Sequence, residues 1–226
     1  MFSFTLVVLV VILALTFDYI NGFHDTANAI ATSVSTKALS PRNAIIIAAT
    51  LNFFGALSGT AVAATIGKNI ISPELVTPIV ITAALIGAIF WNLFTWYFGI
   101  PSSSSHALIG GLVGAVIAGF GLVDVNWLGF SQIFVGLIIT PIIGLVAGSA
   151  VMTLLFWIFK EGSPALINNK FRKLQVISAC MASFAHGSND AQKTMGIITM
   201  VLVGAGLLDT FMVPLWVKIA CALAMA

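Results

Sequence analysis

Long apolar runs separated by short polar stretches make up almost the whole chain. The first run begins at Phe2, and the last is still apolar at Ala226. A run of about 20 apolar residues can cross a hydrocarbon core of about 30 Å as a helix. The pattern therefore predicts an all-α polytopic membrane protein with about five or six membrane segments.

The expected segments are about Thr5–Ala31, Asn43–Ile66, Val76–Phe98, Ala107–Leu122, Phe130–Phe159 and Leu174–Leu207, with a last run from Phe211. The longest polar stretch, residues 160–173, carries four of the nine basic residues. Basic residues in short loops favour the cytoplasmic side. We therefore expect an inner-membrane protein with residues 160–173, Lys37 and Arg42 inside the cell, and with the N-terminus, Glu74, Asp124 and Asp209 outside.

Two polar motifs interrupt these apolar runs. The first is NGFHDTANA at residues 21–29, and the second is AHGSNDAQK at residues 185–193. When Gly22 is aligned with Gly187, an aspartate follows three residues later in each copy, at Asp25 and Asp190. The expected topology makes the two helices antiparallel, so the motifs indicate an inverted-topology repeat transporter fold.

Three regions follow from this repeat. Residues 1–159 form the first repeat, 160–173 a cytoplasmic loop, and 174–226 the start of the second repeat. The first repeat contains a turn of four serines and a histidine after Pro101, before a glycine-rich stretch. The segments around this turn form either two full spans or a re-entrant helical hairpin, and we expect such a hairpin in each half. No second serine turn occurs before Ala226, so we expect a truncated second half and a fragment of a longer protein.

Composition agrees with the membrane prediction. The chain is 60% hydrophobic and 7% charged, against about 25% charged in soluble domains. Its net charge of +2 forms no basic stripe, which makes nucleic acid an unsuitable partner. Glycine pairs at 55/59, 110/114 and 144/148 predict close helix packing, either within one chain or in a homodimer in the lipid bilayer.

An aspartate inside a membrane helix costs about 2.5 to 3.5 kcal/mol on insertion scales, so Asp25 and Asp190 need a physical reason. Carboxylate and amide oxygens suit a hard cation such as sodium. We therefore expect Asp25 and Asp190, with Asn28 and Asn189, to be sodium ligands. The alternative is that both aspartates lie at helix ends in water, or that Asp190 pairs with Lys193.

The serine turn provides hydroxyl groups at an expected helix N-terminus, where the helix dipole favours an anion such as a tetrahedral oxyanion. A simple serine cap after Pro101 is the alternative. The histidines His24, His106 and His186 adjoin the three motifs, and a packing or hydrogen-bonding role is favoured over a proton relay for each. The sequence carries no nucleophile-elbow motif, so we do not expect an enzyme.

These motifs resemble those of the inorganic phosphate transporter (PiT) family. The resemblance covers the whole chain in order: Asn21-Gly-Phe-His-Asp-Thr-Ala-Asn-Ala, Ile100-Pro-Ser-Ser-Ser-Ser-His-Ala and His186-Gly-Ser-Asn-Asp-Ala-Gln-Lys-Thr-Met-Gly. It implies that Ser103, Ser104 and Ser105 touch phosphate. Asp25, Asn28, Asp190 and Gln192 complete the expected phosphate-binding set.

The expected function is therefore uptake of inorganic phosphate across the cell membrane by symport. The expected co-transported ion is sodium or a proton, and no cofactor is expected. Two alternatives stay open at this point. In the first, the substrate is another tetrahedral oxyanion such as sulfate. In the second, this chain is an inactive truncated partner subunit.

Overall fold

The computed structural model describes residues 3–69, 77–122, 125 and 127–226, and within these ranges the regular structure is entirely helical. The helices are α1 (Phe4–Ser35), α2 (Pro41–Leu57), α3 (Ala61–Asn69), α4 (Pro78–Tyr97), α5 (Ser104–Phe120), α6 (Trp127–Phe159), α7 (Pro164–Gly204) and α8 (Leu215–Met225). The predicted all-α class is confirmed. Glu74, Asp124 and the expected segment start at Val76 lie outside the described residues.

Helix starts follow local chemistry that is readable in the sequence. Pro41 and Pro78 stand in the first turns of α2 and α4, where a missing N–H removes no helical hydrogen bond. The residues before them act as caps: Ser40 accepts from the Asn43 N–H, and Thr77 accepts from that of Val80. Short polar residues next to proline thus separate the long apolar helices.

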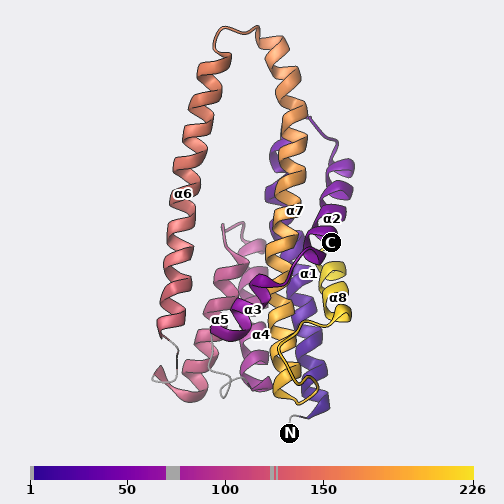
Figure 1. Cartoon of the computed structure of the whole chain (residues 1–226), viewed down its shortest axis with the longest axis vertical. Helices are drawn as coiled ribbons and strands as arrows, with labels where there is room; N and C mark the ends of the chain where they lie inside the picture. The colour runs from indigo at the N-terminus through magenta and orange to yellow at the C-terminus, as the bar shows by residue number, and fades with distance from the viewer. Residues whose placement is uncertain (1–2, 70–76, 123–124, 126) are drawn as a thin grey trace.

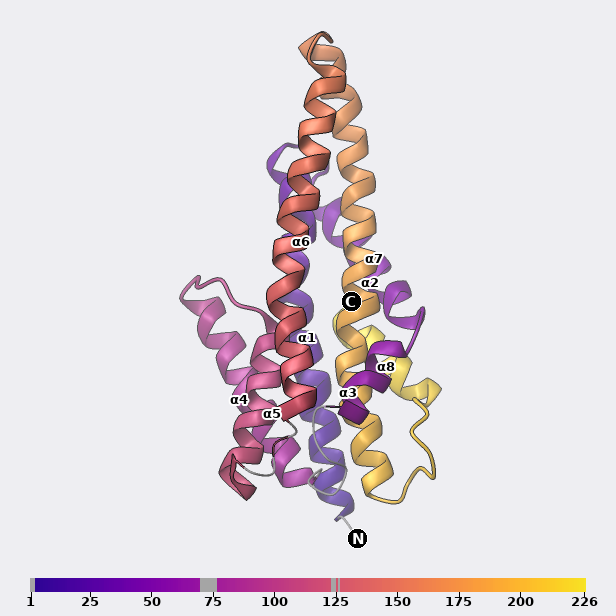
Figure 2. The ribbon, with the colours of Figure 1, turned by 60° about the vertical axis from the view of Figure 1, so that its left-hand side comes forward.

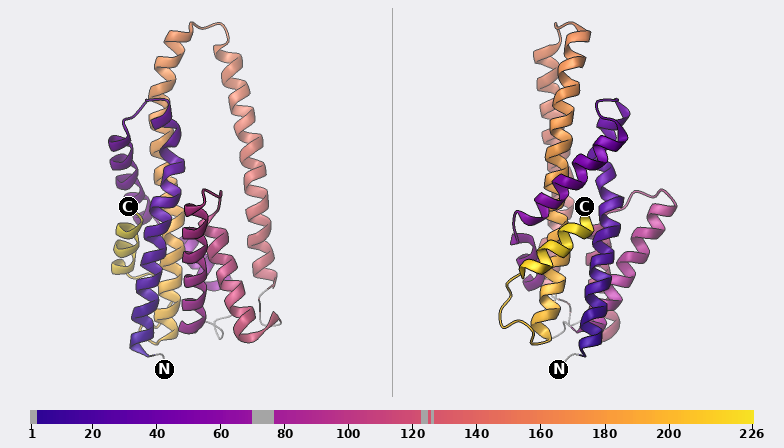
Figure 3. Two further views of the ribbon diagram at one scale, coloured as in Figure 1. Left: turned by 180° about the vertical axis from the view of Figure 1, so that it is seen from behind. Right: turned by 90° about the vertical axis from the view of Figure 1, so that its right-hand side faces the viewer.

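Two antiparallel helices, α1 and α7, form the centre of the molecule (Figures 1 and 3). The α4–α5 pair packs against the α1 side, whereas α2 and α3 pack on α7 (Figure 2). The short α8 contacts both central helices. The opposed directions of α1 and α7 agree with the expected topology, and the full inverted repeat stays a prediction.

Helix α6 stands apart from this bundle and joins α7 at one end of the molecule (Figure 1). Its most apolar window is 0% buried, against 44% for that of α1. The helix continues through Pro141 without interruption. An apolar helix of this kind requires lipid or other protein around it.

Glycine sets the closest helix contact. A Cβ added at Gly187 of α7 would overlap the backbone of Asn52 in α2, and one at Gly55 would overlap the Phe184 carbonyl. The expected close approach at Gly55 is therefore confirmed. Among the described residues, nothing lies within 4 Å of such a Cβ at the pairs 110/114 and 144/148. Gly111 makes the close contact in α5 instead, against the Ala84 carbonyl.

The structure corrects two expected boundaries and the expected number of membrane segments. The second segment is two helices, since α2 ends at Leu57 and α3 begins at Ala61. The loop expected at 160–173 is shorter, because α7 begins at Pro164. Among the described residues, three helices have the length and hydropathy to span a membrane, namely α1, α4 and α6. The break after Leu57 and the shorter α5 and α8 account for part of the difference from the expected number. The long α7, which contains the second polar motif, is also not among the three.

Candidate functional site

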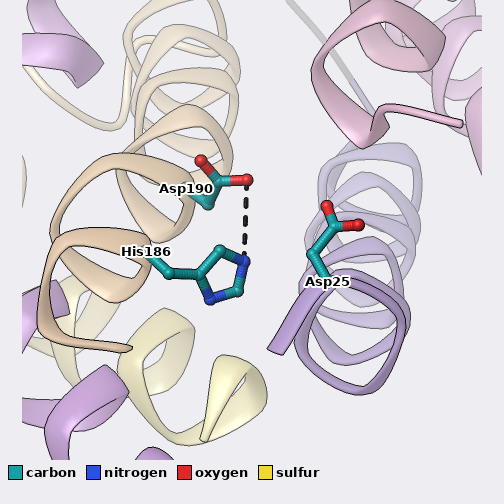
Figure 4. Close-up of side chains that lie close together, drawn as sticks. All are labelled: Asp25, His186 and Asp190. Carbon is teal, nitrogen blue, oxygen red and sulfur yellow. Dashed lines mark ion pairs between the residues drawn. The ribbon is translucent and has the colours of Figure 1, made fainter. Parts of the chain in front are cut away.

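The two polar motifs meet where α1 crosses α7. Asp25 on α1 faces His186 and Asp190 on α7 (Figure 4), and ligand atoms of the three lie within 4.8 Å of one another. His186 Nε2 is 3.8 Å from Asp190 Oδ2, and His24 Nδ1 is 2.6 Å from Asp25 Oδ1. The repeated aspartates are therefore neighbours in space, although the chain separates them by most of its length.

The serine turn reaches the same place from α5. Ser104 is 1% exposed, and its hydroxyl donates to Asp25 Oδ2 at 2.7 Å. Ser103 caps α5 by accepting from the His106 N–H at 3.4 Å, which is the expected alternative role of this turn. The first N–H groups of a helix have no partner within that helix and carry positive partial charge. The N-terminus of α5 thus brings hydrogen-bond donors next to Asp25.

Lys193 links the acidic and serine parts of the cluster. Its ammonium is 2.7 Å from Asp190 Oδ1 and also donates to the Ser105 hydroxyl. The residue is 8% exposed. The expected pairing of Lys193 with Asp190 thus occurs, and the same ammonium lies at the hydroxyl groups suited to an anion.

Buried amides that were not predicted as site residues complete the cluster. Asn21 donates to Asp190 Oδ2 at 3.2 Å. Asn52 of α2 donates to the Thr26 hydroxyl at 2.8 Å, and its Oδ1 is 3.1 Å from His186 Nδ1. Both asparagines are 0% exposed. The position of Asn52 inside an apolar run was the sequence feature that could have indicated its role in the site.

Gln192 occupies a different position from the one expected for a phosphate ligand. Its Oε1 accepts from the Val62 N–H at 2.9 Å, and its Nε2 donates to the Ser188 carbonyl at 2.6 Å. The side chain is 4% exposed. It caps the N-terminus of α3 and thereby fixes that helix on α7.

Asn28 and Asn189, the two amides expected as sodium ligands, are both exposed. Asn189 donates to the Ala185 carbonyl of its own helix at 2.8 Å. A sodium site formed by these asparagines with Asp25 and Asp190 stays a prediction.

The cluster combines two chemistries at one crossing. Two carboxylates, two amides and a threonine hydroxyl supply oxygen atoms that suit a hard cation. One lysine and the serines at a helix N-terminus suit an anion. Paired anion and cation sites where antiparallel helices meet are typical of secondary transporters.

Comparison with known proteins gives the family. A model of the "Phosphate transporter family" matches residues 21–170 and 160–226. The chain is 54% identical over 223 residues to a "Probable low-affinity inorganic phosphate transporter" of Bacillus subtilis (strain 168), covering 97% of this chain and 67% of that protein. It is 34% identical to the "Low-affinity inorganic phosphate transporter PitB" of Escherichia coli (strain K12), covering 88% of this chain and 46% of that protein.

A solved structure has the same fold. "The sodium-dependent phosphate transporter" superposes with a TM-score of 0.80 at 24% identity, over 98% of this chain and 74% of the other. The family match and the named relatives thus define a membrane transport protein and not an enzyme. The chain belongs to the phosphate transporter family, as the motifs indicated.

Proposed function

We propose that the protein takes up inorganic phosphate across the cell membrane by symport with cations. The observation that carries this proposal is the meeting of Asp25, Lys193 and the α5 serines at one helix crossing. Relatives named as phosphate transporters support the substrate. The sequence covers 67% of the length of the Bacillus subtilis relative. The proposed activity is therefore that of the whole transporter.

The proposed phosphate site lies at the N-terminus of α5. Ser104 and Ser105 would donate hydroxyl hydrogens to phosphate, with Ser103 supporting the turn as its cap. The Lys193 ammonium would give the anion a charged partner. The Asp25 carboxylate, at the same place, would accept a hydrogen bond from the protonated oxygen of phosphate. Sulfate has no such proton at neutral pH, so this acceptor favours phosphate over sulfate.

The proposed cation site uses Asp25 and Asp190. Drawing a divalent anion into an inside-negative cell costs about 4.6 kcal/mol per 100 mV, so at least two monovalent cations are needed to cancel its charge. Two carboxylates within one cluster supply that number of anionic ligands. The sodium dependence stated for the protein of the same fold supports sodium. Asn189 and Gln192 would join these sites only by giving up their present hydrogen bonds, those of Asn189 to Ala185 and of Gln192 to Val62 and Ser188.

Labelled-phosphate uptake into proteoliposomes tests the proposal. An inward sodium gradient, a proton gradient and no gradient are compared, with unlabelled sulfate as competitor. We expect gradient-driven uptake that resists sulfate and is lost in Asp25→Asn and Asp190→Asn. Asp209→Asn, which alters an exposed acid outside the cluster, is the matched control. Uptake that sulfate abolishes, or that neither gradient drives, would contradict the proposal.

A further inference from the structure

Asp18 is a buried acid that the proposed phosphate and cation sites leave unused. It lies on α1, two helical turns before Asp25, and is 0% exposed. The Thr194 hydroxyl of α7 donates to its Oδ1 at 2.6 Å, and the thiol of Cys221 on α8 lies beside it. Three helices therefore enclose one carboxyl group.

One of the two oxygen atoms of this carboxyl group lacks a donor. Its second oxygen, Oδ2, has no hydrogen-bond partner among the described residues. One turn further along α1, the buried Oδ1 of Asn21 is likewise without a partner in the described part of the chain. Both atoms are acceptors in the contact between α1 and α7. A positive charge or a donated hydrogen atom would stabilise these two acceptors.

The surrounding charged groups do not supply it. The charged groups of α7 that act on Asp18 are Asp190 and Lys193, whereas Cys221 of α8 lies at hydrogen-bond distance from it. Lys193 is already bonded to Asp190 and Ser105. Helix α4, which also packs on α1, carries no acidic or basic residue. A fully buried carboxylate without a cation is strongly disfavoured, and such a group takes up a proton instead.

A proton fits this position better than sodium does. Sodium prefers several hard oxygen ligands, whereas the thiol of Cys221 is a soft one. A proton on Oδ2 neutralises the carboxyl group and turns the unpartnered acceptor into a donor. The unpartnered Asn21 Oδ1, one turn away, is an acceptor for such a donor.

We propose that Asp18 is a proton-binding site enclosed by α1, α7 and α8, separate from the proposed sodium site, and that it releases its proton when these helices separate during transport. The contacts Asp18–Thr194 and Asn21–Asp190 join the same two helices, so a movement that opens one loosens the other. The coupling to transport rests on the proposed function, whereas the bound proton does not.

Infrared difference spectroscopy of the purified protein tests the bound proton directly. A change of pH should reveal the carbonyl band of a buried protonated carboxylic acid. We expect this band to be absent in Asp18→Asn, shifted in Thr194→Val, and unchanged in the control Asp209→Asn. A band that persists in Asp18→Asn would overturn the proposal. The proposal would also be overturned if the wild type showed no such band and Asp18→Asn lost the binding of labelled sodium.

Phosphate uptake over a range of external pH tests the coupling. Because phosphate itself titrates near neutral pH, the readout is the ratio of Asp18→Asn to wild type at each pH. A site that must bind one proton changes in occupancy by up to about tenfold per pH unit above its pKa, so we expect this ratio to change by up to that factor. Phosphate exchange without a gradient should persist in the variant. A constant ratio would overturn the coupling, and absence of uptake by the wild type would contradict the proposed function alone.

Discussion

At the residue scale, Lys193 is buried and has two half-buried partners, Asp190 and Ser105, and this makes its removal informative. Breaking a buried ion pair by removing one partner costs about 3 to 5 kcal/mol, because the other charge is left alone. Lys193→Met should therefore unpair Asp190 and also remove the cation beside Ser105. We expect phosphate binding, measured by calorimetry on the purified protein, to fall by about a hundredfold or more.

Lys160→Met is the matched control for this prediction, since Lys160 is exposed and its partner Glu161 is 3.9 Å away. Exposed pairs contribute at most about 1 kcal/mol, so this variant should bind phosphate like the wild type. Equal affinity in Lys193→Met and wild type would show that Lys193 has no part in holding the anion.

The Ser104 hydroxyl donates to the Asp25 carboxylate, and Ser102 is not part of that contact. A hydrogen bond to a charged group is worth about 1.5 to 3 kcal/mol. Ser104→Ala should therefore lower the apparent affinity for phosphate by about ten- to a hundredfold, whereas Ser102→Ala should change it little. The measurement is the phosphate concentration at half-maximal uptake. Equal effects of the two substitutions would argue that the turn acts only as a helix cap.

The site could be predicted from the sequence only as far as its repeat extends. Asp25 and Asp190 stand out because the same glycine-to-aspartate spacing occurs twice, and the serine turn because four hydroxyl residues follow a proline. Asn52 and Asp18 have no repeated copy, and their roles depend on partners more than a hundred residues away, His186 and Thr194. Only the folded chain reveals such contacts.

At the element scale, the contact between α2 and α7 depends on glycine. The Cβ of Gly187→Ala would overlap backbone atoms of Asn52, which cannot rotate away as a side chain could. Overpacking of this kind costs about 1 to 3 kcal/mol. We expect Gly187→Ala to lower the thermal unfolding midpoint in detergent and to displace the Asn52–His186 contact.

Gly144→Ala tests whether that effect comes from the close contact. Gly144 lies in α6, and no atom of the described residues lies within 4 Å of a Cβ added there. Because alanine also has the higher helix propensity, this variant should keep or slightly raise the midpoint. Equal loss of stability in both variants would mean that Gly144 packs closely against something outside this chain.

The apolar pattern predicted where helices exist better than where they end. The start of α4 differs by only two residues from the expectation, because Pro78 marks it. The break between α2 and α3 was missed, since Ser58, Gly59 and Thr60 carry no proline and lie inside an apolar run. The longer α7 was missed because residues 164–173 are polar, and hydropathy does not distinguish a polar helix from a loop.

At the scale of the whole molecule, the basic residues gather at one end. Arg172, at the start of α7, donates to the carbonyls of Thr36 and Lys37 at the end of α1, at 2.9 Å and 3.4 Å. This contact places the two basic stretches side by side. It also satisfies carbonyl groups that the end of a helix leaves without partners. A concentration of basic residues at one end supports the proposal that this end faces the cytoplasm.

Chemical labelling tests this orientation. Single cysteines are introduced as Glu161→Cys and Asp209→Cys, both exposed and at opposite ends of α7, in a Cys180→Ser background. If the basic end is cytoplasmic, a membrane-impermeant thiol reagent should label the cysteine at 161 only in inside-out vesicles and the one at 209 only in right-side-out vesicles. Buried Cys221 should stay unreacted in both, which provides an internal control. The reverse pattern would invert the proposed topology and would make the α1 N-terminus cytoplasmic, since α1 and α7 are antiparallel.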